Sequence, residues 1–172
     1  MKTIITVVLS ALMLALPSAT SVRAQEKEKA DADANFLTKV IPGTAASVKI
    51  IEYAAKNTAD PKVRDFAEHV AKQHKEFVKT AGGHAKRLNI AVVTDPDKDS
   101  KQTIDKLSKL KGTDLDVAFL EWLIDGHKNT TVFDSEVKNG NDAALQAFAK
   151  AAITSGNEHL KGARELLAKI KK

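Results

Sequence analysis

Three of the five histidines, His74, His127 and His159, are the residues of this sequence best suited to chemistry. Each falls within the apolar stripe of a different predicted helix. His69 lies about 140° from His74 around its helix and is expected to face solvent, and His84 lies at the edge of the stripe. Neutral imidazole is a ligand for zinc, copper and iron. The pattern therefore makes His74, His127 and His159 candidate ligands of a single metal ion.

The simpler interpretation, which we favour at this point, gives these histidines a structural role and the protein no cofactor. A buried imidazole packs on apolar side chains and bonds to a nearby hydroxyl, carboxylate or water. Such neutral imidazoles resist protonation, so the fold would lose stability as pH falls through about 6. The candidate partners in the sequence are Thr44, Ser47, Thr131, Asp134 and Ser155.

Spacing along the helices argues against a shared ion. Counted from the turn at Gly140, His127 is 13 residues back and His159 is 19 residues on. Their heights along the bundle should therefore differ by about 9 Å at ~1.5 Å per residue. All ligand nitrogens of one ion must lie within about 2.1 Å of it. Only helix stagger, or a bend at Gly156, would bring the histidines together.

The sequence also lacks the carboxylates of a ferritin-type dimetal site, in which two helices each supply a Glu and two supply Glu-x-x-His. No Glu-x-x-His occurs. Asp116 and Asp134 lie roughly 16 and 10 Å along the axis from His127, and Glu158 points about 100° away from His159. Neither a Gly-x-Ser-x-Gly elbow nor a glycine-rich phosphate loop is present. No catalytic residue can be named, and we expect a protein that is not an enzyme.

The elements that must position the histidines are amphipathic helices, because apolar residues recur at helical spacing from Phe36 onward. Pro42 should bend the first of them or divide it into a short helix and a longer one. Four long helices without strands predict an all-α antiparallel bundle, with a short extra helix between the second and third. The predicted helices cover Leu37 to Ala55, Pro61 to Leu88, Asp97 to Leu110, Thr113 to Lys138 and Asp142 to Ile170.

The N-terminus predicts export. Residues 1–24 have a positive start, an apolar run from Ile4 to Leu16, and a cleavage pattern ending at Ala24. Residues 25–35 contain no apolar side chain larger than Ala and predict a flexible leader, so the bundle domain should span residues 36–172. No second apolar run is long enough to cross a membrane. The mature protein is expected in a bacterial periplasm or outside the cell.

Composition narrows the possible functions further. Cysteine is absent, which excludes disulfides, thiol chemistry and iron–sulfur clusters. Without Lys2 and Arg23 the chain keeps 25 of its 27 basic residues against 22 acidic ones, and they are spread along the helices. Such an even distribution does not favour binding to nucleic acid.

Several of these segments together resemble the domain of unknown function 4142 family. The residues concerned are Phe36-Leu37, the run from Asp60 to Ala67 leading to His74, Ala118 to Leu120 leading to His127, and His159. The resemblance covers Phe36 to Ile170 and implies a small exported bacterial protein with a ferritin-like four-helix bundle. It implies no reaction.

The chain departs from the family pattern where carboxylates are concerned. Relative to the pattern of the family, Ser47-Val48-Lys49 replaces an acidic pair, and Gln73 and Gly126 replace an Asp before the second-helix and third-helix histidines. Two functions stay open. One is a non-catalytic binding or envelope-stress module, self-associating or touching the envelope through the faces that carry Trp122 and Phe133; its partners are unknown. The other is a metal-binding or metal-redox bundle.

Overall fold

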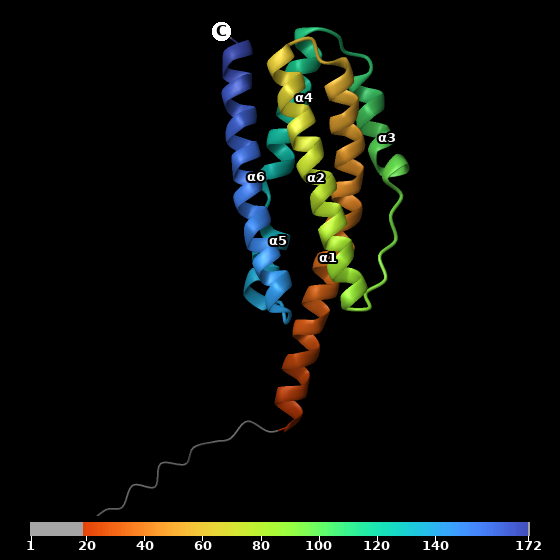
Figure 1. Ribbon diagram of the computed structural model, residues 1–172, viewed down its shortest axis with the longest axis vertical. Coiled ribbons are helices and arrows are strands. Elements are labelled where there is room, and N and C mark those ends of the chain that lie inside the picture. The colour runs from red at the N-terminus through yellow and green to blue at the C-terminus, as the bar shows by residue number, and fades with distance from the viewer. Residues whose placement is uncertain (1–18, 172) are drawn as a thin grey trace, which may run out of the picture.

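The computed structural model describes residues 19–171, which form six helices and, within that range, no strand. Figure 1 shows them as one elongated bundle. The all-α prediction is therefore confirmed. The helices are α1 (Ala19–Asn57), α2 (Pro61–Arg87), α3 (Pro96–Leu107), α4 (Thr113–Lys128), α5 (Thr131–Asn139) and α6 (Ala143–Ile170).

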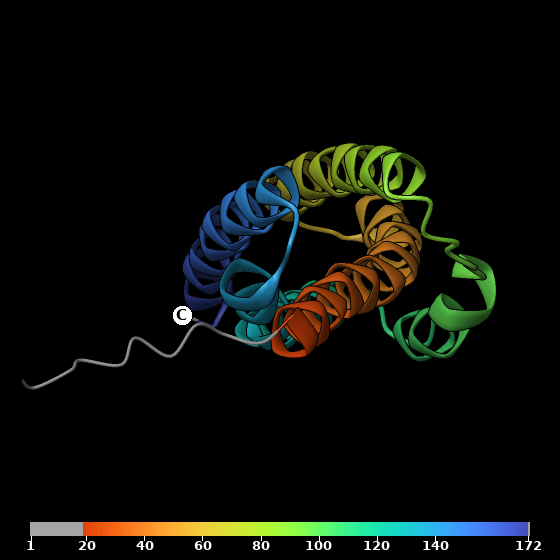
Figure 2. The same cartoon turned by 90° about the horizontal axis from the view of Figure 1, so that it is seen from below.

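The topology is that of a four-helix bundle with one crossover. Helices α1 and α2 form one antiparallel hairpin (Figure 1). Helices α4 and α5 together form one arm of a second hairpin, and α6 forms the other arm. The connection between the hairpins, which contains α3, returns along the length of the bundle, so α2 and α4 run in the same direction. Seen along the bundle, α3 lies outside the ring of long helices and packs on α1 (Figure 2). A single long crossover is the ferritin-like arrangement.

The predicted start of α2 is confirmed in detail. The Asp60 carboxylate accepts hydrogen bonds from the backbone N–H groups of Lys62 and Val63 at 2.7 and 3.4 Å, and Pro61 occupies the first helical position. These contacts satisfy N–H groups that a helix start leaves without an internal partner. Helix α6 begins in the same way, because Asp142 caps it by accepting from the N–H of Leu145 at 2.8 Å.

The N-terminal part of the chain differs from expectation. Helix α1 begins at Ala19, so residues 25–35, predicted to be a flexible leader, are helical. It also continues through Pro42 without a break. Asp33 is buried and contacts the start of α6, so the packed domain begins before Phe36. Of the predicted signal peptide, residues 1–18 lie outside the described part of the chain, and cleavage near Ala24 stays a prediction.

The third long helix was predicted to run unbroken to Lys138, which is wrong. Helix α4 ends at Lys128, Asn129 is extended with φ −98° and ψ 103°, and α5 begins at Thr131. The Asn129 side chain accepts a hydrogen bond from the N–H of Thr131 at 3.0 Å. Asn and β-branched Thr are poor helix formers that bond readily to nearby backbone, so this segment tolerates an interruption.

The apolar core falls into two main parts. One cluster, around Ile51, Val70 and Phe119, fills the end where α1 turns into α2. The other, around Phe36 and Leu145, fills the opposite end. His74, His127 and His159 lie along their helices between the residues of the two clusters.

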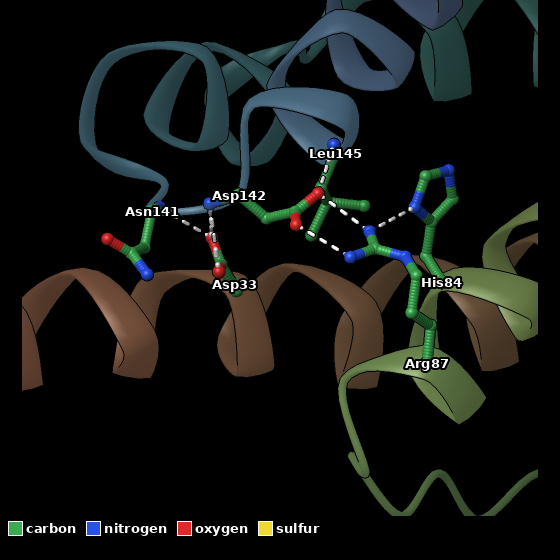
Figure 3. A network of polar contacts seen from close by, with 6 residues as sticks. All are labelled: Asp33, His84, Arg87, Asn141, Asp142 and Leu145. Atoms are coloured by element: carbon green, nitrogen blue, oxygen red, sulfur yellow. Dashed lines mark hydrogen bonds and ion pairs between the residues drawn. The ribbon is translucent and has the colours of Figure 1, made fainter.

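Buried carboxylates tie the ends of the bundle together. Asp116 of α4 accepts from the N–H groups of Ala59 and Asp60 at 2.8 and 2.9 Å. At the other end, Asp33 of α1 accepts from the N–H groups of Asn141 and Asp142, and Arg87 forms a bidentate pair with Asp142 (Figure 3). None of the helices from 19 to 171 is long and apolar enough to span a membrane.

Candidate metal centre

The three sequence-predicted histidines meet in the interior of the bundle. His74 comes from α2, His127 from α4 and His159 from α6, and one ring nitrogen of each lies within 4.8 Å of the others. The ring centroids are 5.4, 5.4 and 5.2 Å apart, which is close to an equilateral triangle. His69 is exposed and His84 contacts Arg87, so neither belongs to the cluster.

The outer nitrogens of two imidazoles are held by carbonyl oxygens. His127 Nδ1 lies 2.9 Å from the carbonyl oxygen of Leu123, and His159 Nε2 lies against Oε1 of Gln73. A carbonyl oxygen only accepts, so His127 Nδ1 carries its ring proton, and His159 Nε2 carries its own with the Gln73 amide in this orientation. The inner nitrogens, His127 Nε2 and His159 Nδ1, are 3.2 Å apart. Two lone pairs then face each other, an arrangement that a bound cation between them stabilises.

His74 has one ring nitrogen without a partner among the described residues. Its Nδ1 is buried and has no hydrogen-bond partner among residues 19–171. Leaving a buried polar atom without a partner costs about 1–3 kcal/mol. A bound ion would remove that cost if Nδ1 is the coordinating atom.

Burial keeps the imidazoles neutral. Desolvation, followed by the proximity of His127 and His159, lowers the pKa of His74 from 6.5 to about 3. Desolvation, followed by the proximity of His127 and then His69, lowers the pKa of His159 from 6.5 to about 4. Burial also lowers the pKa of His127, against the opposing effect of its bond to Leu123. Near neutral pH the lone pairs are therefore free of protons, as metal ligation requires.

The cluster fits one ion with small adjustments. Ligand nitrogens of a tetrahedral site with ~2.1 Å bonds are about 3.4 Å apart, which is close to the separation of His127 Nε2 and His159 Nδ1. Even for a triangle with all sides at the 4.8 Å limit, the centre is about 2.8 Å from each corner, so each ring needs to move less than about 1 Å.

A cavity of about 400 Å³ opens beside the cluster. Its walls come from all four sides of the bundle and include all three histidines. Trp122 and Phe133, predicted to lie on faces used for self-association or envelope contact, are half-buried and line this space. No Asp or Glu is among the lining residues.

The predicted height difference of about 9 Å between His127 and His159 is wrong. An extended residue at Asn129 rises about 3.3 Å instead of ~1.5 Å, and α6 begins only at Ala143. Both changes bring the two histidines toward one level.

The predicted hydrogen-bond partners were also wrong for the most part. Thr44, Ser47 and Ser155 line the cavity, whereas Asp134 instead accepts from Thr130. The partner that sequence reasoning missed is Gln73, which stands next to His74 but contacts His159 and lies 3.5 Å from the Ser155 hydroxyl. The signal in the sequence that could have indicated Gln73 was its position directly before His74.

These features define a class of protein: an all-α bundle with a crossover connection and a buried cluster of three histidines. The chain belongs to the family described as "Domain of unknown function (DUF4142)", whose model matches residues 18–166. It is also similar to a crystal structure described as "putative secreted protein DUF305" from Streptomyces coelicolor. That likeness has a TM-score of 0.72 at 18% identity and covers 81% of this chain and 94% of the other, which shows a shared fold. No curated protein matches the sequence.

Proposed function

We propose that this protein is an exported bundle that binds one zinc or copper ion through His74, His127 and His159. The observation that carries the proposal is the facing pair of nitrogens, His127 Nε2 and His159 Nδ1 at 3.2 Å, with both outer nitrogens held by carbonyl oxygens. Such outer contacts orient metal-binding histidines and fix the tautomer that coordinates.

The donor set favours particular ions. Three neutral imidazoles without carboxylate or thiolate suit zinc and copper, whereas magnesium and calcium prefer oxygen ligands. A single ion is expected, because bridging two ions requires carboxylates that the cavity wall does not supply. Three protein ligands beside an open cavity would leave a fourth coordination position available.

Export supports this proposal, because an exported protein is exposed to metal ions that enter from outside the cell. The predicted signal sequence and the description of the similar Streptomyces coelicolor protein as secreted both point to a periplasmic or extracellular location. Metal capture, storage or delivery are the roles that we propose for this site.

The test is metal content followed by titration. Mature protein purified from its native compartment without chelator should contain close to one zinc or copper ion per chain by elemental mass spectrometry. Chelator-treated protein should bind one ion in isothermal titration calorimetry, and its melting temperature should rise, because the ion binds only the folded state.

Variants locate the ion. His127→Ala should abolish tight binding, and Gln73→Leu should weaken it by about 10- to 100-fold, as loss of an outer contact does. His69→Ala, an exposed histidine of the same helix, should leave binding unchanged. A protein that is free of metal as isolated and also fails to bind zinc or copper would overturn the proposal.

A second function has its own support. If the Gln73 amide is turned, its nitrogen donates to His159, His159 donates to His127, and His127 donates to Leu123, which closes a neutral network without an ion. The protein would then be the non-catalytic binding module considered above. In that case Gln73→Leu and His127→Ala should lower stability, while zinc and copper should leave the wild-type melting temperature unchanged.

A further inference from the structure

The cavity walls carry no negative charge that could balance a bound cation. Three neutral imidazoles do not reduce the charge of a divalent ion, and no acidic side chain lines the cavity. The charged side chain that does line it, Lys39, is also positive. A cation of this kind is costly to bury unless a negative group accompanies it. The missing negative charge must therefore come from outside the protein.

The remaining walls are suited to an apolar body. Val40 and Phe77 line the cavity together with Trp122, Phe133 and Ile153. A volume of about 400 Å³ lies within the range of small-molecule sites, which are mostly apolar with a few polar groups that fix orientation.

The cavity is also open to solvent. Gly43 of α1 and Gly126 of α4 both line it and are exposed, and a Cβ atom added at either would meet no other atom within 4 Å. A ligand can therefore enter past these two glycines without displacement of the core.

We propose that this cavity binds a small organic monoanion, with an apolar body against Phe77 and Trp122 and a carboxylate that completes the coordination of the histidine-bound ion. The inference rests on the metal-binding function proposed above and adds the chemical class of the ligand. Lys39 adds attraction at the wall and selects for a negative group.

The test compares three probes on zinc-loaded mature protein by isothermal titration calorimetry and thermal shift. Benzoate carries both the charge and the apolar ring, acetate only the charge, and benzamide only the ring. Benzoate should bind at least about tenfold more tightly than either, since burial of the ring adds to the contact with the ion. It should raise the melting temperature of zinc-loaded protein and leave that of metal-free protein unchanged.

Variants test the place of binding. Gly43→Leu should narrow the cavity and weaken benzoate binding at least about tenfold without changing zinc affinity. Lys39→Gln should weaken benzoate binding by about two- to fivefold, whereas Lys150→Gln, an exposed lysine that does not line the cavity, should have no effect.

The outcomes separate this inference from the function on which it rests. If zinc binds at one ion per chain and benzoate binds no better than acetate or benzamide, the organic-anion site is refuted and the metal site stands. If benzoate binds metal-free protein as tightly as zinc-loaded protein, coordination of the ion by the carboxylate is refuted. If zinc does not bind, both proposals fail.

Discussion

Glu136 is a buried carboxyl group whose ionisation should destabilise the fold as pH rises from about 4.5 to about 7. Its side chain is only 1% exposed, and neither carboxylate oxygen has a hydrogen-bond partner in the described part of the chain. Burial, followed by the negative charge and hydrogen-bonding proximity of Asp33 and then the charge of Asp142, raises the pKa of Glu136 from 4.5 to about 7. Substitution by Gln keeps the shape and removes the charge.

The sign of the effect follows from proton linkage. A carboxyl group with a raised pKa binds its proton more tightly in the folded state, so the free energy of unfolding falls between pH 4.5 and about pH 7 and then levels off. At 1.36 kcal/mol per pKa unit the cost is about 3 kcal/mol above pH 7 and under ~1 kcal/mol at about pH 5. The free energy of unfolding of Glu136→Gln, relative to that of the wild type, should therefore be about 2–3 kcal/mol higher above pH 7 than at about pH 5.

The assay is urea unfolding followed by far-ultraviolet circular dichroism at about pH 5 and about pH 8, in the presence of chelator. The comparison of variant with wild type at each pH cancels every other titrating group that the two share. Glu68→Gln, an exposed residue of α2, is the matched control and should show no pH-dependent difference. A Glu136→Gln effect of the same size at both pH values would refute the reasoning.

Two further predictions concern other buried groups. Because burial lowers the pKa of His74 to about 3, the unfolded chain binds more protons below pH 6.5, and metal-free wild type should lose about 2 kcal/mol between pH 7 and pH 5 through this residue. His74→Leu should remove that loss in urea unfolding, and an unchanged acid sensitivity would contradict it. Asp116→Ala should lower the free energy of unfolding by about 3 kcal/mol, since two backbone N–H groups lose a charged acceptor. Asp114→Ala, at an exposed neighbouring site, should cost much less, and equal losses would count against the capping role of Asp116.

Most of the helical frame is predictable from local signals. The Asp60-Pro61 start of α2 and the run to Ile170 in α6 both follow from capping residues and apolar periodicity. The break after Lys128 was missed because apolar periodicity continues across it, whereas the Asn129 side chain bonds there to the N–H of Thr131. The helical character of residues 25–35 was missed because their small and charged side chains carry no apolar stripe.

The site was predictable in its members but not in its geometry. Apolar periodicity selected His74, His127 and His159, and the structure brings those three together. Their convergence depends on the break between α4 and α5, so a calculation that assumes one straight helix places His127 at the wrong height. Gln73 is 86 residues from His159, and Asp33 is 108 residues from Asn141. Contacts at such separations leave no local pattern in one sequence.

The absence of acidic side chains from the cavity wall changes what this bundle can hold. With carboxylates on several helices, a ferritin-like frame neutralises two ions from within. Here the wall contributed by α1 offers hydroxyl groups and a lysine, and α2 offers Gln73 next to His74. A site built from neutral nitrogens leaves the charge of its ion uncompensated and must share it with whatever enters the cavity. The same wall composition that disfavours a bridged pair of ions therefore favours a single ion that binds together with an exogenous anion.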